Sequence, residues 1–225
     1  MRKAVLHLKK SDPLMRAIIE QVGPCRMEFG EPVFHSLAES IVYQQLNGKA
    51  AATIFKRFTG LTGDPVTPNG ILKLSAEQLR AVGLSKQKSS YLFDMAERAQ
   101  RGELDFSKLA EMTDDEVIEH LTQVKGVGVW TAHMFLMFTL QRANVLPTGD
   151  FGIRMAMHKH YLNHGAKRKN GVRPAKGKKG AEKAPEIKIT LPTPEQMEKI
   201  AKRWEPYRSI ACWYLWRSLD TKTIG

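Results

Sequence analysis

The order of apolar and polar residues along the chain has the period of an α-helix in most segments. After Pro13, apolar side chains recur at Leu14, Ile18 and Val22, and this spacing places them on one face of a helix. The same kind of pattern predicts further helices over these ranges: 33–44, 49–58, 75–83, 85–99, 114–123, 130–140, 194–204 and 206–219, with another helix directly after Asp150.

Local sequence signals support the starts of several of these helices. Ser75 and Gln78 have the spacing of a capping box, and Thr113 is a candidate N-cap for the helix over 114–123. Such side chains satisfy the first backbone N–H groups of a helix, which have no partner inside it. The stretch 60–70, which contains two prolines, is expected to be a loop.

Signals for β-strands are weak. No run of alternating β-branched residues exceeds about four positions, and the two candidate strands are Val5–Leu8 and Ile187–Leu191. The sequence therefore predicts an all-α fold of roughly ten helices.

Two glycines separate the helix over 114–123 from the helix over 130–140. Gly126 and Gly128 lie one residue apart, and such a pair permits positive φ and close approach of a large partner. The N–H groups at the start of the second helix suit a phosphate. A non-specific helix-hairpin-helix would grip one DNA strand through the N–H groups of Gly126, Gly128 and Thr131, with a charge from Lys125. An ordinary αα-hairpin with a glycine turn is the alternative.

A lone carboxylate, Asp150, follows Leu146-Pro-Thr-Gly, ten residues after the second helix of this hairpin. An Asp directly before a helix is commonly an N-cap, whose side chain accepts hydrogen bonds from the helix. Capping also fixes the orientation of a carboxylate, so Asp150 is a candidate for a chemical role as well. Both interpretations stand.

The charge of the chain favours a polyanionic partner. Its 225 residues carry a formal net charge of +12, which is typical of nucleic-acid-binding proteins.

Only Cys25 and Cys212 are present, so we expect a reducing compartment and no disulfide framework. The N-terminal residues lack the apolar region of a secretion signal, and the longest apolar stretch, Val127–Leu140, is too short to span a bilayer. We expect a protein without membrane contact, cytoplasmic and nucleoid-associated in a bacterium or nuclear in a eukaryote.

A basic segment near the C-terminal third carries much of this charge. Residues 167–188 contain nine Lys and Arg against Glu182 and Glu186, which is +7 of the total of +12. The segment 164–190 is either a basic arm that contacts phosphates or a solvated, flexible insertion.

Aromatic residues concentrate at the C-terminal end. Three of the four tryptophans lie between 204 and 216, and the fourth is Trp130. Such residues are usually core, but a deep aromatic pocket would need the same density. The sequence leaves both possibilities open.

Taken together, these features resemble the helix-hairpin-helix DNA glycosylases with a Gly/Pro-rich loop and an aspartate. The resemblance rests on Gln45-Leu46, on Val124–Ala132 and on Pro147-Thr-Gly-Asp150. The tail Arg203–Trp216, with its W-x-P-Y-R-S sequence, is similar to the alkylpurine glycosylases of the 3-methyladenine type II class. The resemblance as a whole covers about residues 31–217, and the basic insertion is a departure from the family pattern.

The resemblance implies two helical subdomains with a DNA-facing cleft between them. We expect residues 31–142 to form the central subdomain, which contains the hairpin. Residues 1–30 and 143–225 would form the second, with the basic insertion at about 164–190.

Roles for individual residues follow from the resemblance. Asp150 would be the catalytic carboxylate, and Leu46, with Gln45 beside it, would fill the gap left by an extruded nucleotide. The side chains expected in the base pocket are Tyr43, Trp130, Met134 and Trp216. The hairpin of this family often holds a monovalent cation, Na⁺ or K⁺, through main-chain carbonyls, which would be those of Thr122, Val124 and Val127.

The implied activity is that of a monomeric, monofunctional base excision repair enzyme. It would release alkylated purines, such as 3-methyladenine and 7-methylguanine, from double-stranded DNA and leave an abasic site. Glycosylase/lyases carry a catalytic Lys where this chain has Trp130, and only Cys212 lies near the C-terminus, so neither lyase activity nor an iron–sulfur cluster is expected. The alternatives are a non-catalytic DNA-binding module and a glycosylase for deaminated or oxidised bases.

Overall fold

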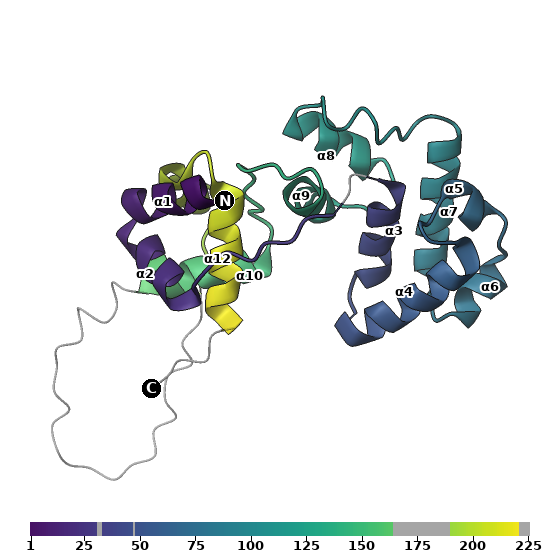
Figure 1. Cartoon of the computed structure of the whole chain (residues 1–225), viewed down its shortest axis with the longest axis horizontal. Helices are drawn as coiled ribbons and strands as arrows, with labels where there is room; N and C mark the ends of the chain where they lie inside the picture. Colours follow the sequence, from purple (N-terminus) through teal and green to yellow (C-terminus); the bar gives the residue numbers. More distant parts are fainter. Residues whose placement is uncertain (31–32, 47, 164–189, 221–225) are drawn as a thin grey trace, which may run out of the picture. The chain divides into compact units, whose positions relative to one another are not determined.

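The computed structural model describes residues 1–30, 33–46, 48–163 and 190–220, and it divides into two compact units (Figure 1). Unit 1 comprises Met1–Met27 with Leu146–Gly225, and unit 2 comprises Glu28–Val145. The sequence placed the subdomain boundaries at 30/31 and 142/143. Of the basic segment 164–190, the described residues include only Thr190.

All regular elements in the described residues are helices, as the sequence predicted (Figure 1). Those of unit 1 are α1 (Arg2–Ser11), α2 (Pro13–Val22), α10 (Phe151–Met157), a π-helical turn (His158–Leu162), α11 (Pro194–Ala201), a 3-10 turn (Lys202–Trp204) and α12 (Arg208–Asp220). The helix α12 packs against both α2 and α10, and its Cys212, Trp213 and Tyr214 are buried there.

The N-terminal strand candidate is wrong, because Val5–Leu8 lies within α1. Ala4 and Leu8 are buried four positions apart, which is the spacing of one helical face. The other candidate, Ile187–Leu191, lies outside the described residues except for its last two positions, and these are not in a strand.

The carboxylate of Asp12 ties unit 1 together. It is fully buried, and its Oδ1 accepts hydrogen bonds from the N–H groups of Leu14 and Met15 at 2.9 and 3.2 Å. Its Oδ2 accepts from the Tyr161 hydroxyl and from the Trp204 indole, both at 2.8 Å. Asp12, the N-cap of α2, is therefore also an anchor for two distant aromatic side chains.

Unit 2 is built around one long helix. Its elements are α3 (Phe34–Tyr43), α4 (Gly48–Thr62), α5 (Pro68–Leu72), α6 (Ala76–Ala81), α7 (Lys86–Gln100), α8 (Asp114–Thr122) and α9 (Val129–Phe138). The helix α7 packs against α3, α5 and α6, and Leu92, Met95 and Ala96 are its buried face. The α8 and α9 helices pack on each other.

The start signals read from the sequence are confirmed, whereas some helix ends differ. Ser75 and Thr113 both form capping boxes. The loop expected at 60–70 is shorter, because α4 continues to Thr62 and α5 begins at Pro68. Thr67 caps α5 through a hydrogen bond from Gly70 N–H, a signal that the sequence analysis missed. None of the helices in the described part of the chain is long and apolar enough to cross a bilayer.

Candidate functional site

Asp150 lies at the N-cap of α10 in unit 1, buried except for 7% of its surface. Its Oδ1 accepts a hydrogen bond from the N–H of Ile153 at 2.7 Å, which confirms the prediction that Asp150 is a helix N-cap. A hydrogen bond from Asp150 N–H to the Pro147 carbonyl at 2.9 Å closes the preceding turn. The carboxylate is therefore held by both the loop before it and the helix after it.

A second donor reaches the same oxygen from α12. The indole Nε1 of Trp216 donates to Asp150 Oδ1 at 2.9 Å, which gives this tryptophan a partner that the sequence did not predict. Gly152 makes room for the indole, because a Cβ at that position would lie 2.9 Å from Trp216 Cδ1 and 3.2 Å from Asp150 Oδ1. Only a glycine leaves both groups where they are.

The thiol of Cys212, the other reactive side chain near Asp150, is inert. Cys212 is fully buried in α12, and desolvation, with the negative charge of Asp150, raises the pKa of its thiol well above the usual value. A thiol with a raised pKa carries almost no thiolate at neutral pH. The chemistry available in this part of unit 1 is therefore that of a fixed carboxylate.

The glycine hairpin in unit 2 joins α8 to α9, and its two glycines differ. Gly126 has φ +78°, and a Cβ there would lie 2.1 Å from the ring of Tyr91. Gly128 is the N-cap of α9 with φ −96°, so the expectation that the pair permits positive φ holds for Gly126 alone. A Cβ on Gly128 would meet nothing within 4 Å, which leaves its backbone open to a partner.

Lys125 is exposed but already has a partner. Its Nζ lies 3.5 Å from Oδ1 of Asp94 on α7, and its backbone N–H donates to Asp94 Oδ2 at 2.9 Å. Burial works to raise the pKa of the Asp94 carboxyl, but the hydrogen bonds and charges of Lys125 and Arg98 hold that pKa below its ordinary value. Asp94 is thus ionised at neutral pH and anchors the hairpin turn.

A pocket of about 590 Å³ collects most of the predicted residues of unit 2. It is lined by Ser40, Tyr43, Gln44, Gln45, Leu46, Gly126, Trp130, Thr131 and Met134. The structure therefore brings the predicted wedge and the predicted pocket residues of this unit around one opening, together with Gly126 and Thr131 of the hairpin, whereas Lys125 and Gly128 do not line it.

Gln44 joins the two sides of this pocket, and Trp130 and Tyr43 are aromatic residues of its lining. Gln44 Nε2 donates to the Gly126 carbonyl at 3.0 Å and to the Thr131 hydroxyl at 3.4 Å, so it joins the end of α3 to the hairpin. Trp130, in the first turn of α9, is 47% exposed. For Tyr43, desolvation and the charge of Glu39 raise the pKa, so its phenol is neutral at physiological pH.

The aromatic residues of the C-terminal tail divide between core and site. Trp204 and Trp213 are buried core residues, whereas Trp216 contacts Asp150. The core interpretation is therefore confirmed for Trp204 and Trp213, whereas a base-pocket role for Trp216 stays a prediction.

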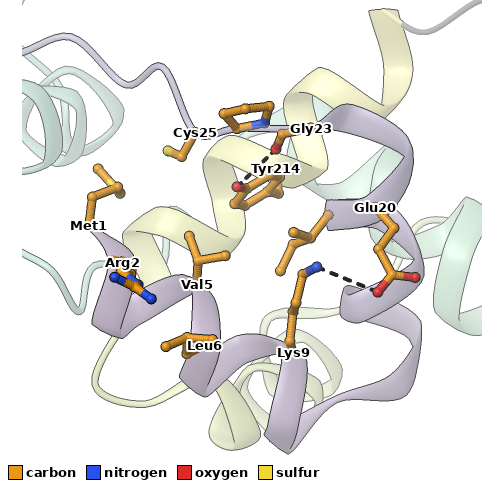
Figure 2. Close-up of a pocket in the computed structure, with 11 residues that line it drawn as sticks. Met1, Arg2, Val5, Leu6, Lys9, Glu20, Gly23, Cys25 and Tyr214 are labelled. Carbon is orange, nitrogen blue, oxygen red and sulfur yellow. Dashed lines mark hydrogen bonds and ion pairs between the residues drawn. The ribbon is translucent and has the colours of Figure 1, made fainter.

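A second cavity of about 570 Å³ lies in unit 1 between α1, α2 and α12 (Figure 2). Figure 2 shows Tyr214 donating to the Gly23 carbonyl at 3.2 Å and an ion pair between Lys9 and Glu20 at 3.5 Å. None of the predicted site residues lines this cavity.

Four residues that shape the site were missed by the sequence analysis: Gln44, Lys88, Asp94 and Gly152. Gly152 had a local signal, because a glycine two positions into a helix is costly unless something approaches it closely. The other three act on residues that are distant in sequence and had none.

Residues 38–180 match the model of the HhH-GPD superfamily base excision DNA repair proteins. The chain is 33% identical to the DNA-3-methyladenine glycosylase 1 of Schizosaccharomyces pombe, over 97% of this chain and 87% of that protein. It is 34% identical to the DNA-3-methyladenine glycosylase of Saccharomyces cerevisiae, over 86% of this chain and 69% of that protein.

Solved structures agree with this relationship. The S. pombe 3-methyladenine DNA glycosylase in complex with abasic DNA superimposes with a TM-score of 0.74 at 31% identity, covering 97% of both chains. A DNA-3-methyladenine glycosidase from Bacillus halodurans gives a TM-score of 0.76 at 33% identity, over 97% of this chain and 89% of the other. The chain therefore belongs to the HhH-GPD superfamily of base excision DNA repair proteins.

Proposed function

We propose that this protein is a monofunctional DNA glycosylase that hydrolyses the N-glycosidic bond of alkylated purines in double-stranded DNA. The observation that carries the proposal is the carboxylate of Asp150, fixed by the N–H of Ile153 and the indole of Trp216. Relatives at 33 and 34% identity are named DNA-3-methyladenine glycosylases.

One carboxylate is sufficient for this reaction. A purine alkylated at N3 or N7 is cationic while it is bonded to the sugar, so on cleavage it takes the electron pair of the broken bond and leaves as a neutral base such as 3-methyladenine. The sugar then develops positive charge, which Asp150 stabilises. Water adds to C1′ and loses its proton to the carboxylate or to solvent. The products are the free base and an abasic site.

The pocket in unit 2 suits a flat, cationic base. A base inside a duplex is out of reach, so the nucleotide is extruded. The ring of Trp130 is exposed at the pocket, and each cation–π contact with such a ring contributes roughly 0.5–2 kcal/mol. Tyr43 and Met134 line the same pocket.

Leu46 is the proposed wedge. It is 39% exposed at the pocket rim, and an apolar side chain at such a place can fill the stack that the nucleotide leaves. Gly128 and the start of α9 offer backbone N–H groups to a phosphate of the same strand. Lys125 contributes less charge than its exposure implies, because Asp94 lies 3.5 Å from its Nζ.

The identity of residue 130 argues against strand cleavage. A lyase needs an amine to form a Schiff base with the sugar, and Trp130 supplies none. The enzyme is therefore proposed to release the base and leave the strand intact.

A monovalent cation at the hairpin is part of the proposal. Its ligands would be the carbonyls of Thr122, Val124 and Val127, which are neutral oxygen donors at the last residue of α8 and in the turn that follows it. The Val124 carbonyl accepts the Val127 N–H at 3.0 Å and keeps a second lone pair. The cation would hold the turn in shape for a phosphate. Weaker DNA affinity when K⁺ and Na⁺ are replaced by a bulky organic cation at equal ionic strength would support it.

The test is mass spectrometry of the bases released from methylated duplex DNA. Released 3-methyladenine or 7-methylguanine, with strands that break only after heating in alkali, is the expected result. If the protein releases no base from methylated DNA but releases oxidised or deaminated bases from DNA that contains them, it is instead a glycosylase for those bases. Salt-sensitive binding without release of any base would identify a non-catalytic DNA-binding module.

A further inference from the structure

Three side chains along one face of α7 contact the two loops that line the pocket of unit 2. Lys88, Tyr91 and Asp94 follow one another at intervals of three residues, which places them on neighbouring turns of the same helical face. Lys88 contacts the end of α3, and Tyr91 and Asp94 contact the hairpin.

Lys88 closes the C-terminal end of α3. Its Nζ donates to the carbonyl of Val42 at 2.6 Å and to that of Gln44 at 2.7 Å. The last carbonyls of a helix have no partner inside it, and a cation there is favourable. Desolvation lowers the pKa of the Lys88 ammonium, as expected for a cation whose solvent has been replaced by carbonyl groups.

The backbone changes direction directly after this contact. Gln45 has φ +57°, a left-handed conformation that is strained for a non-glycine residue and persists only when its surroundings hold it. Leu46 follows, partly exposed at the pocket rim, with its N–H 3.3 Å from the Tyr43 carbonyl. The position of Leu46 thus depends on how the end of α3 is held.

The hairpin is held from the same helix. The ring of Tyr91 occupies the space in which Gly126 would carry a Cβ, and Asp94 accepts the Lys125 N–H. Gln44 then bridges the two loops, because its side chain donates to the Gly126 carbonyl while its own carbonyl accepts from Lys88. Loop and hairpin are therefore fixed to α7 and to each other.

We infer that Lys88 is a positioning residue. It holds Leu46 in the conformation that enters the duplex, and it sets the position of Leu46 relative to the hairpin. The inference rests on the proposed function, in which Leu46 is the wedge. Lys88 itself need not touch DNA, since both of its carbonyl partners lie within the protein.

A purely structural role for Lys88 gives a different expectation. In that case its loss would lower thermal stability and weaken every kind of DNA binding, whatever residue stands at 46. A positioning role requires that the effect on the damaged site depend on the Leu46 side chain. A double-mutant cycle separates the two.

The variants are Lys88→Met, Leu46→Ala and the double variant, with Lys86→Met as the control. Lys86 is an exposed lysine in the first turn of the same helix. Lys88→Arg keeps cationic donors and serves as the conservative rescue. If Lys88→Met does not fold, Lys88→Gln replaces it in the same cycle.

The readout is binding to a duplex with a tetrahydrofuran abasic site and a 2-aminopurine beside it, whose fluorescence reports unstacking. No bond is broken, so the measurement does not depend on catalysis. We expect Lys88→Met to weaken binding about tenfold and to reduce the fluorescence change. In the Leu46→Ala background the same substitution should change affinity less than about twofold.

Lys88→Arg and Lys86→Met should both bind within about threefold of wild type. Equal losses with and without Leu46, or a fluorescence change that Lys88→Met leaves intact, would overturn the inference. Failure of the wild-type protein to release bases from methylated DNA would instead count against the proposed function, and the cycle on abasic DNA would still decide the role of Lys88.

Discussion

The indole Nε1 of Trp216 donates a hydrogen bond to Oδ1 of Asp150 at 2.9 Å, across 66 positions of sequence. The same oxygen accepts the N–H of Ile153 at 2.7 Å. Two donors on one carboxylate oxygen fix the plane of the group as well as its position. The indole of Trp216 is thus part of the support of the proposed catalytic carboxylate.

Trp216→Phe tests this support, because it keeps an aromatic ring and removes the N–H donor. We expect the single-turnover rate of base release to fall about ten- to a hundredfold, since small misplacements of a reacting group have effects of this size. Affinity for abasic-site DNA should change little. A rate within twofold of wild type would show that the hydrogen bond has no role in the reaction.

Gly152→Ala tests the space that the indole occupies. The added Cβ would lie 2.9 Å from Trp216 Cδ1, so the ring or the start of α10 must move and the rate of base release should fall. Gly149→Ala is the matched control in the preceding loop, where a Cβ would meet nothing within 4 Å. Similar rates for the two variants would contradict this account.

Asp12→Ala should destabilise unit 1. The substitution leaves two backbone N–H groups, the Tyr161 hydroxyl and the Trp204 indole without their acceptor. We expect the free energy of unfolding to fall by about 3 kcal/mol or more, because hydrogen bonds to a charged group contribute roughly 1.5–3 kcal/mol each. Urea denaturation measures it, and a loss below about 1 kcal/mol would show that the network adapts.

Asp94→Asn should change how stability depends on pH. The native interactions hold the pKa of Asp94 below its ordinary value, so the carboxylate stabilises the fold fully above about pH 4 and loses this contribution as pH falls through the lowered pKa. Wild type should therefore exceed the variant in unfolding free energy at pH 7, and the difference should disappear in acid. Glu97→Gln, one turn further along α7 and exposed, is the control. A difference that persists at pH 2 would contradict an electrostatic origin.

Much of the fold could be read from the sequence because its signals are local. Ser75 and Thr113 begin helices through contacts three residues away, and such contacts leave recognisable spacings. The error at Val5–Leu8 has the opposite cause. A short apolar alternation also fits a helix with Ala4 and Leu8 on its buried face, and the choice depends on tertiary packing, here of α1 on α2, on the 3-10 turn and on α12.

The local part of the candidate site could also be read from the sequence. Asp150 and the glycine hairpin are short motifs, and the structure places both at helix starts. The contacts that hold them join residues far apart in the chain: 66 positions for Trp216 and Asp150, 44 for Lys88 and Gln44, and 31 for Lys125 and Asp94. No spacing in a single sequence reveals such pairs, so the sequence indicated a charge from Lys125 but not its partner Asp94.

The catalytic role of Asp150 is tested most directly by comparing wild type with Asp150→Asn on methylated duplex DNA. Asparagine keeps an oxygen that can accept from Ile153 and Trp216, so the variant removes the charge while retaining the cap. We expect release of 3-methyladenine, followed by mass spectrometry, to fall by at least about a thousandfold, with affinity for abasic-site DNA within about threefold of wild type. Base release by Asp150→Asn at a rate close to that of wild type would contradict the account.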